Sequence, residues 1–212
     1  GHRAVTLTVK GLLKAPGDVT DVQMDAIADL ADRYNFGEIR STHEQNLVFA
    51  HVKQADLYPL WQQLVELDLA RPVVGTIQDM IVCPGLDFCS LANAETLSVA
   101  RQINEKFDDL DYLYELGEIK LKMSGCINAC AHHHVGHIGI LGVDKKGESY
   151  YQFTLGGSST ADASLGKVLG KSVPLVEVAA TLEKILAVFV EIRLEGERFI
   201  DTVRRVGNEP FK

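Results

Sequence analysis

The first third of the chain alternates between strand-like and helix-like patterns of apolar residues. Apolar and polar residues alternate over Val5–Lys10, which is typical of a half-buried strand. Thr20 and Gln23 have the spacing of a capping box, and the apolar residues that follow keep helical spacing to about Tyr34. Two further strands and a second amphipathic helix are expected over Glu38–Ser41, Leu47–His51 and Ala55–Leu67. This order of elements predicts a ferredoxin-like α+β unit.

The pattern changes near Pro72, where a second unit is expected to begin. Its strands are predicted at Val73–Val82, Ile119–Met123, Ile138–Val143 and Tyr150–Leu155, the last two forming a hairpin around Lys145–Gly147. Its helices are predicted at Ala92–Phe107 with Asn93 as N-cap, from Pro174 to about Leu194, and from Glu197 to Arg205. Because no flexible linker separates the two parts, we expect two closely packed domains, 1–72 and 73–212.

Composition and charge narrow the class of protein. The chain has 212 residues, of which 46% are hydrophobic, so it can bury a core. Its 29 Asp and Glu exceed its 21 Lys and Arg, and the net charge is −8. Nucleic-acid surfaces are normally basic, so this balance argues against nucleic-acid binding. The sequence contains no apolar run long enough for a bilayer and no signal-peptide profile after Gly1, which predicts a cytoplasmic protein without membrane contact.

The four cysteines lie close together in the sequence, at Cys83, Cys89, Cys126 and Cys130. Three interpretations compete: buried unreactive thiols, a zinc site and an iron–sulfur cluster. The spacing of the second pair suits zinc and that of the first pair does not, whereas cluster ligands tolerate irregular spacing. Pro84, Gly85 and Gly125 place both pairs in turn-forming sequence, where the backbone can wrap around a ligand. This context favours a cluster or a metal.

Four of the seven histidines follow the last cysteine within six residues: His132, His133, His134 and His137. A polar loop is the simplest explanation. Metal binding is a second one, because His133 and His137 would share a face if the segment were helical. Recognition of an anion or cofactor, or a role as proton source, is a third.

A second polar cluster lies between two predicted strands and contains Arg40, Thr42, His43, Gln45 and Asn46. Turns are commonly polar for purely structural reasons. Arg40 is the most informative member, because a guanidinium can bind a carboxylate with two parallel hydrogen bonds. The cluster is therefore either a structural turn or part of an anion-binding surface.

The segments Cys83–Ala92 and Ser124–Cys130 resemble the paired motifs of the sirohaem-dependent sulfite and nitrite reductases. The stretch from Arg40 to Asn46 is similar to the ferredoxin-like half-domain of that family. The resemblance extends from Val5 to the end of the chain, and the two cysteine motifs are specific as a pair. It implies a ferredoxin-like half-domain followed by an α/β domain that binds sirohaem and an iron–sulfur cluster.

The resemblance also implies roles for individual residues. The four cysteines would ligate a [4Fe–4S] cluster, and the thiolate of Cys130 would also be the axial ligand of the sirohaem iron. Sirohaem carries many carboxylates, which need cationic and amide donors. The residues implied for this are Arg40, Thr42, Gln45, Asn46, Asn128, His132 and His133. The implied reaction is the six-electron reduction of sulfite to sulfide, with nitrite reduction to ammonia as the alternative.

Enzymes of this family contain two related halves, and this chain resembles the C-terminal one. We therefore expect part of an assimilatory-type sulfite reductase, inactive alone, that needs an N-terminal half or a partner subunit. The sequence has no nucleotide-binding glycine fingerprint, so electrons are expected from a ferredoxin or flavoprotein donor. A face left exposed could pair two copies as a homodimer. A four-thiolate metal-binding module without redox chemistry stays open as a different class of function.

Overall fold

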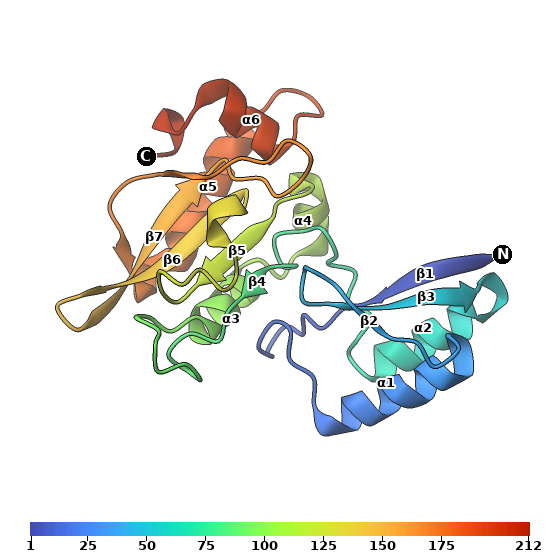
Figure 1. The fold of residues 1–212 in the computed structure, drawn as a ribbon. Helices are drawn as coiled ribbons and strands as arrows, with labels where there is room; N and C mark the ends of the chain where they lie inside the picture. Colours follow the sequence, from blue (N-terminus) through green and yellow to red (C-terminus); the bar gives the residue numbers. More distant parts are fainter. The chain divides into compact units, whose positions relative to one another are not determined.

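The computed structural model describes residues 1–212, which form two compact units, Gly1–Val74 and Gly75–Lys212. We call them unit 1 and unit 2. Figure 1 shows the elements of each, coloured along the chain. Both units combine helices with a sheet, so the α+β fold class expected from the sequence is confirmed.

Unit 1 is a three-stranded antiparallel sheet covered on one face by two helices (Figure 1). The strand order is β1-β3-β2. The elements are β1 (His2–Leu7), α1 (Asp21–Tyr34), β2 (Arg40–Ser41), β3 (Leu47–Lys53), η1 (Gln54–Asp56) and α2 (Leu57–Glu66). All of the elements expected here are present. The first strand ends earlier than predicted, because the Thr8 N–H donates to the Leu69 carbonyl and the Val9 N–H to the Asn46 side chain instead of to a strand.

Helix α1 begins with the capping box that the sequence predicts. The Thr20 hydroxyl accepts from the Gln23 N–H at 3.1 Å, and the Gln23 side chain accepts from the Thr20 N–H at 3.0 Å. Gln23 also donates to the Leu67 carbonyl at 2.7 Å and is buried, whereas Met24 is 60% exposed. A polar residue thus occupies the core-facing position that hydrophobic spacing alone would give to Met24.

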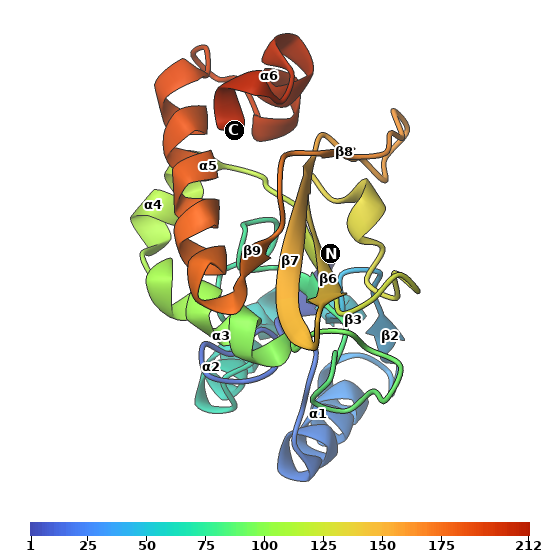
Figure 2. The ribbon, with the colours of Figure 1, turned by 90° about the vertical axis from the view of Figure 1, so that its left-hand side faces the viewer.

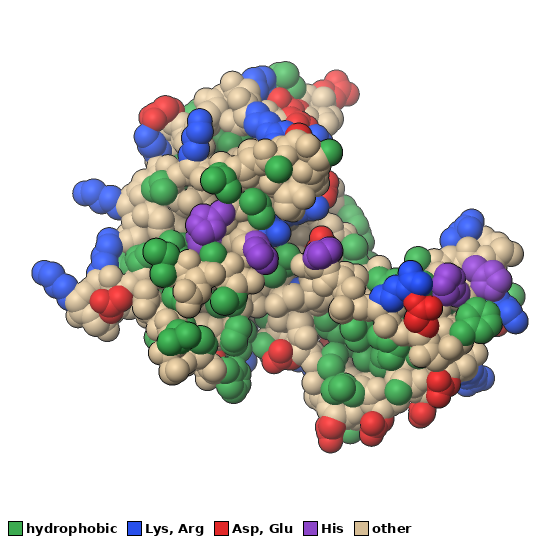
Figure 3. All heavy atoms as spheres, viewed as in Figure 1, with side chains coloured by type: hydrophobic (Ala, Val, Ile, Leu, Met, Phe, Trp, Pro, Cys, Tyr) green, Lys and Arg blue, Asp and Glu red, His purple; other side chains and the backbone are tan.

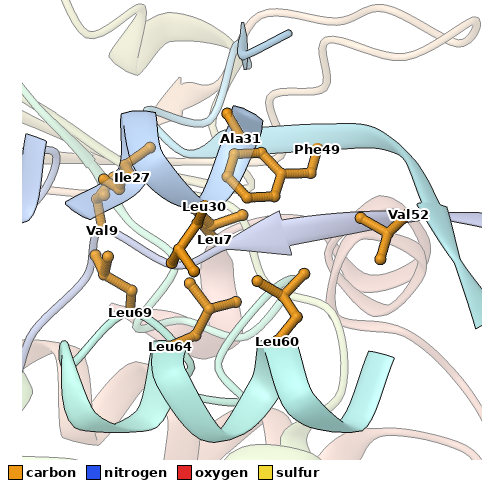
Figure 4. Packing of buried hydrophobic residues seen from close by; sticks show 10 residues of the cluster. All are labelled: Leu7, Val9, Ile27, Leu30, Ala31, Phe49, Val52, Leu60, Leu64 and Leu69. Atoms are coloured by element: carbon orange, nitrogen blue, oxygen red, sulfur yellow. The ribbon is translucent and has the colours of Figure 1, made fainter. Parts of the chain in front are cut away.

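The core of unit 1 lies between the sheet and the two helices (Figure 4). Strand β3 contributes both Phe49 and Val52, although residues three apart on a regular strand face opposite sides. The register explains this: Arg3 pairs with Val52 and Val5 with Phe49, so β3 carries one extra residue opposite β1. This bulge turns both side chains toward α1 and α2.

Unit 2 contains a mixed sheet with the strand order β4-β5-β6-β7-β8, and β9 pairs with β7. Strands β4, β5 and β6 run parallel, and the remaining pairs are antiparallel. The strands are β4 (Ile81–Val82), β5 (Leu121–Ser124), β6 (Ile138–Lys145), β7 (Glu148–Leu155), β8 (Lys167–Val168) and β9 (Val173–Pro174). The predicted β6–β7 hairpin is present, and Lys146 and Gly147 both have positive φ, as a tight hairpin turn requires.

Helices α3, α4 and α5 lie on one side of strands β6 and β7 (Figure 2). The helices are α3 (Leu97–Lys106), α4 (Leu110–Leu116), α5 (Val178–Ile192) and α6 (Phe199–Val206), with short turns η2 (His133–Val135), η3 (Leu175–Glu177) and η4 (Glu209–Phe211). The longest, α5, has 15 residues, and no helix is long and apolar enough to cross a membrane.

The structure corrects four details predicted for unit 2. Helix α3 starts at Leu97 and not at Ala92, because the Ala94 carbonyl accepts from the Leu86 N–H and the Glu95 carbonyl accepts from the Tyr151 hydroxyl instead of from the next helical turn. Its N-cap position is Thr96 instead of Asn93. The expected long strand before Cys83 is mostly turns, with strand pairing confined to Ile81–Val82. The helix expected from Pro174 begins with the turn η3.

Candidate functional site

The first cysteine loop begins where strand β4 ends. Cys83 follows directly, and its N–H donates to the Met123 carbonyl on β5 at 3.1 Å. The chain then turns at Gly85, whose φ of 59° is left-handed, and the Cys89 N–H donates to the Gly85 carbonyl at 2.9 Å. Cys83 and Cys89 therefore sit on one loop at the carboxyl end of β4.

The second cysteine loop follows β5 and contains two left-handed residues that are not glycine. Ala129 has a φ of 54° and His132 a φ of 53°, on either side of Cys130. Such residues cost about 1–3 kcal/mol each, and they concentrate at ligand-binding sites. The Ala129 N–H donates to the Cys126 carbonyl, and the His132 N–H donates to the Ala129 carbonyl at 2.7 Å. The chain thus turns sharply on both sides of Cys130.

The two cysteine loops touch each other, because they leave the same end of parallel neighbours β4 and β5. A Cβ on Gly125 would lie 2.9 Å from the Gly85 Cα and 2.8 Å from the Ala94 carbonyl oxygen. The Gly125 carbonyl also accepts from the N–H groups of Asn93 and Ala94, at 2.8 and 3.1 Å. Ligands commonly bind beyond the carboxyl ends of parallel strands. All four cysteines are therefore gathered at the end of the sheet where a ligand is expected.

The four thiols are free, and none forms a disulfide. Cys126 is buried, Cys83 and Cys89 are half-buried, and Cys130 is exposed. No group of three or more His, Cys, Asp or Glu side chains is arranged to surround one metal ion. A [4Fe–4S] cluster makes a different demand, because each of its irons takes its own thiolate and the four sulfurs need not meet at one point. Two touching loops with four free thiols fit such a cluster, and the exposed Cys130 leaves one sulfur accessible to a second group.

Apolar side chains are exposed on the same two loops. Phe88 and Ile127 are each 80% exposed, and Leu91 is 70% exposed. Figure 3 shows hydrophobic side chains at the surface in the region where Figure 1 draws the loop after β4. A cluster of exposed apolar groups marks a surface that binds a ligand or partner. The thiols are thus bordered by apolar surface.

The histidines after Cys130 do not share a helix face, so the arrangement that the metal interpretation of His133 and His137 requires is not present. His133–Val135 is a single turn, η2, and His137 lies beyond it, directly before β6. His137 Nδ1 accepts from the Lys120 N–H at 3.2 Å. Burial lowers the pKa of His137 to about 4, which keeps it neutral at pH 7. His137 therefore acts as a hydrogen-bond acceptor within the fold.

His133 is enclosed and only partly satisfied. Its side chain is 1% exposed, and its Nδ1 is buried without a hydrogen-bond partner. Burial, and to a smaller extent the neighbouring His134, lower the pKa of His133 to about 4. The two rings lie 3.9 Å apart between centroids, and His134 is exposed, as are His132 and Asn128. Of the residues predicted to meet a cofactor in unit 2, Asn128 and His132 are accessible and His133 is not.

The predicted polar cluster of unit 1 is a turn whose groups largely bind one another. The Thr42 hydroxyl accepts from the N–H groups of Glu44 at 3.2 Å and Asn46 at 3.1 Å. Asn46 is buried, and its side-chain oxygen accepts from the Val9 N–H at 3.2 Å. Gln45 has a left-handed φ of 55°. Three of the four residues predicted here to meet a cofactor therefore also build the turn.

Arg40 differs from the other three residues. It lies on β2, its side chain is 56% exposed, and its Nε pairs with the Glu38 carboxylate. Glu38 is also 3.8 Å from His51 Nε2. The terminal guanidinium nitrogens of Arg40 have no partner within the protein, so they are available to an anionic group.

The site also uses a residue that the sequence analysis did not single out. Thr96 is fully buried, and its hydroxyl donates to the Cys83 carbonyl. Asp87, on the first cysteine loop, accepts from the Thr96 N–H at 3.5 Å and the Leu97 N–H at 3.4 Å. A threonine just before the helical pattern is a cap signal. It was missed because the helix start was placed too early.

The two units and the paired cysteine loops agree with the family that the sequence resembles. Residues 75–212 match the family described as nitrite and sulphite reductase 4Fe-4S domain, and residues 1–67 match the nitrite/sulfite reductase ferredoxin-like half domain. The chain therefore belongs to the nitrite and sulfite reductase family, as its sequence motifs predicted.

Known relatives are considerably longer than this chain. It is 32% identical over 218 residues to the sulfite reductase [NADPH] hemoprotein beta-component of Bacillus licheniformis, covering 98% of the chain and 36% of that protein. It is 29% identical over 203 residues to the assimilatory ferredoxin-dependent nitrite reductase of Haloferax mediterranei, covering 93% of the chain and 34% of that protein. The solved structure of the Mycobacterium tuberculosis NirA protein superposes with a TM-score of 0.82 at 30% identity, over 99% of the chain and 39% of NirA.

Proposed function

We propose that this chain is part of an assimilatory-type sulfite reductase that reduces sulfite to sulfide with six electrons. The observation that carries the proposal is the contact between the two cysteine loops at the carboxyl ends of β4 and β5. Gly85 and Gly125 make this contact possible, and it gathers four free thiols from two segments of the sequence. Family membership supports the same chemistry.

In this proposal Cys83, Cys89, Cys126 and Cys130 ligate a [4Fe–4S] cluster, and Cys130 also binds the iron of sirohaem. When bound, these groups supply single electrons at an iron that can take the substrate anion. The protein's own contribution is to hold four thiolates on two loops that touch each other. The exposure of Cys130, compared with buried Cys126, supports its choice as the shared ligand.

The carboxylates of sirohaem need donors from the protein. We propose that Arg40, Gln45, Asn128 and His132 meet them, and that Thr42 and Asn46 act mainly by fixing the turn that carries Gln45. Exposure of Arg40, Asn128 and His132 supports their part in this proposal. His133 is neutral and enclosed, and its ring lies 3.9 Å from that of the exposed His134, so we assign it a supporting role.

The chain spans 34% to 39% of the length of these relatives, and we propose that it is inactive alone. It would correspond to the C-terminal half, and an N-terminal half or partner subunit would supply the remaining wall of the site. A ferredoxin or flavoprotein would deliver electrons, and the substrate is a small anion. We further propose a cytoplasmic location and pairing of two copies through the exposed apolar surface.

The direct test is metal analysis of the protein purified without oxygen. We expect about four iron atoms and about four acid-labile sulfides per chain, with a visible cluster spectrum. The variant Cys89→Ser should lose both iron and sulfide, because one iron loses its thiolate. The matched variant Ser90→Ala, at the neighbouring exposed position, should keep them. Zinc without sulfide would contradict the proposal and support the non-redox four-thiolate module.

Nitrite reduction is the second candidate function. It is supported by the similarity to the nitrite reductase of Haloferax mediterranei. Turnover of sulfite and of nitrite by the whole native protein with a chemical reductant separates the two. We expect a higher kcat/KM for sulfite, and a clear preference for nitrite would replace the first candidate with the second.

A further inference from the structure

The sulfur of Cys83 accepts a hydrogen bond from the other cysteine loop. The Gly125 N–H donates to Cys83 Sγ over an N···S distance of 3.1 Å. The donor belongs to the residue that precedes Cys126, so the bond joins the two halves of the site. Of the four cysteine sulfurs, it is that of Cys83 that has such a donor. The four ligands of the proposed cluster are therefore not equivalent.

The donor is held in place by its surroundings. The Gly125 carbonyl accepts two hydrogen bonds, from Asn93 and Ala94, which fixes the orientation of the residue. A Cβ on Gly125 would approach the Ala94 carbonyl oxygen to 2.8 Å and the Gly85 Cα to 2.9 Å. Gly125 can thus neither carry a side chain nor rotate away without separating the loops. Its N–H stays directed at the sulfur.

The acceptor is held by Thr96. The Cys83 N–H donates to the Met123 carbonyl at 3.1 Å, and the Cys83 carbonyl accepts from the Thr96 hydroxyl. Thr96 is fully buried, and Asp87 accepts from its N–H, so the hydroxyl has little freedom to move. Both polar groups of the Cys83 backbone are therefore occupied. Removal of the Thr96 hydroxyl would release one of them.

A hydrogen bond to a ligand sulfur changes the electron affinity of a cluster. Negative charge on the sulfur increases when the cluster takes an electron, and an N–H donor then binds it more strongly. Such donors favour the reduced state and are among the factors that set cluster potentials. The sign is therefore fixed: a better aligned donor gives a higher reduction potential.

We propose that the Gly125 N–H raises the reduction potential of the cluster through Cys83, and that Thr96 is the positioning residue that keeps Cys83 Sγ aligned with it. This inference rests on the proposed function, because it requires Cys83 to be a cluster ligand. It adds a distinct role for one of the four cysteines and for a residue outside the cysteine motifs.

The test compares Thr96→Val with Thr96→Ser in the whole native protein, purified anaerobically. Valine keeps the shape of threonine and lacks the hydroxyl, whereas serine keeps the hydroxyl. At a given potential, we expect the ratio of oxidised to reduced cluster to be up to about tenfold higher in Thr96→Val than in the wild type. This corresponds to a negative shift of the reduction potential of up to about 59 mV for one electron. Thr96→Ser should titrate like the wild type. Potentials are measured by redox titration followed by electron paramagnetic resonance.

A second readout reports the hydrogen bond itself. Preparing the wild-type protein in D2O replaces the Gly125 N–H by N–D and should shift iron–sulfur stretching bands in the resonance Raman spectrum. The shift should be smaller in Thr96→Val and unchanged in Thr96→Ser. A merely structural role for Thr96 would alter stability without changing this shift.

The outcomes separate this inference from the proposed function. A wild-type protein that binds no cluster contradicts the proposed function. A protein that binds its cluster, with the same potential and deuterium shift in Thr96→Val as in wild type, overturns the role of Thr96 and Gly125. If Thr96→Val does not fold, the wild-type spectrum decides, because the absence of any deuterium shift equally overturns the inference.

Discussion

The turn between β2 and β3 and the pair of cysteine loops use similar residues for different ends. Both contain polar side chains and left-handed residues that are not glycine. In the β2–β3 turn, the side chains of Thr42 and Asn46 bind backbone groups of the same unit. In the cysteine loops, backbone groups bind one another and the side chains of Thr96 and Asp87, and of the four cysteine sulfurs it is that of Cys83 that accepts a hydrogen bond.

This difference separates a structural turn from a binding site. A buried polar side chain that satisfies backbone groups has used its bonding capacity for the fold. A reactive side chain on a loop whose backbone is already satisfied keeps that capacity for a ligand. By this criterion we propose that the cysteine loops and Arg40 each keep groups available for a ligand, and that Thr42 and Asn46 serve mainly the fold of unit 1. The three predictions below test that division.

The largest expected effect is that of a side chain at the contact between the cysteine loops. In Gly85→Ala, the Cβ would lie 2.5 Å from the Thr96 hydroxyl oxygen and 2.7 Å from the Ala94 carbonyl oxygen, at a φ of 59°. Left-handed strain of about 1–2 kcal/mol and overpacking of about 1–3 kcal/mol should together lower the unfolding free energy by about 2–5 kcal/mol. Urea unfolding of the protein measures this.

Gly170→Ala is the matched control for that variant. Nothing lies within 4 Å of its Cβ position, so its unfolding free energy should stay within about 0.5 kcal/mol of wild type. Equal effects of the two substitutions would show that the loop contact carries no special constraint.

The second prediction is that acidification lowers the free energy of unfolding, because His133 is neutral in the folded protein and protonated in the unfolded chain. Its pKa is lowered from 6.5 to about 4 by burial in the folded protein, so below pH 6.5 the unfolded chain binds more protons than the folded one. Stability should be complete above about pH 6.5 and fall toward pH 4, by on the order of 3 kcal/mol for this residue. His137 acts in the same direction, because its pKa is lowered to about 4 as well.

The variant His133→Leu should flatten this pH dependence, since leucine does not titrate. His43→Gln, at an exposed position of the β2–β3 turn, should leave the slope unchanged. The measurement is the unfolding free energy of the protein at a series of pH values. A slope that His133→Leu leaves as steep as in the wild type would refute the assignment.

The smallest effect compares two residues of unit 1 directly. Asn46→Ala leaves the buried Val9 N–H without its side-chain acceptor and should cost about 1–3 kcal/mol of unfolding free energy. Arg40→Ala removes an exposed group and should change stability by less than about 0.5 kcal/mol. Arg40→Ala should instead lower the sirohaem content of the purified whole protein, measured by absorbance. The reverse pattern would exchange the roles assigned to the two residues.

Local signals in the sequence predicted much of the fold because their causes are local. The capping box at Thr20 and Gln23 involves residues three apart, and the Lys146–Gly147 turn needs only its own dihedral angles. The elements of unit 1 follow from periodicity in the same way. Predictions were less accurate where the partner is distant: the start of α3 depends on Tyr151, whose hydroxyl donates to the Glu95 carbonyl, and the burial of Gln23 depends on Leu67.

The candidate site divides along the same line. The sequence by itself determined which residues are the candidates for the chemistry, since four cysteines in two turn-forming motifs are readable from residue types and spacing. Only the tertiary structure decided how they meet. The pairing of β4 with β5 brings Gly125 to Cys83, 42 residues away, and buries Thr96 against the Cys83 carbonyl. Contacts across that separation arise from strand pairing and packing, which local patterns do not encode.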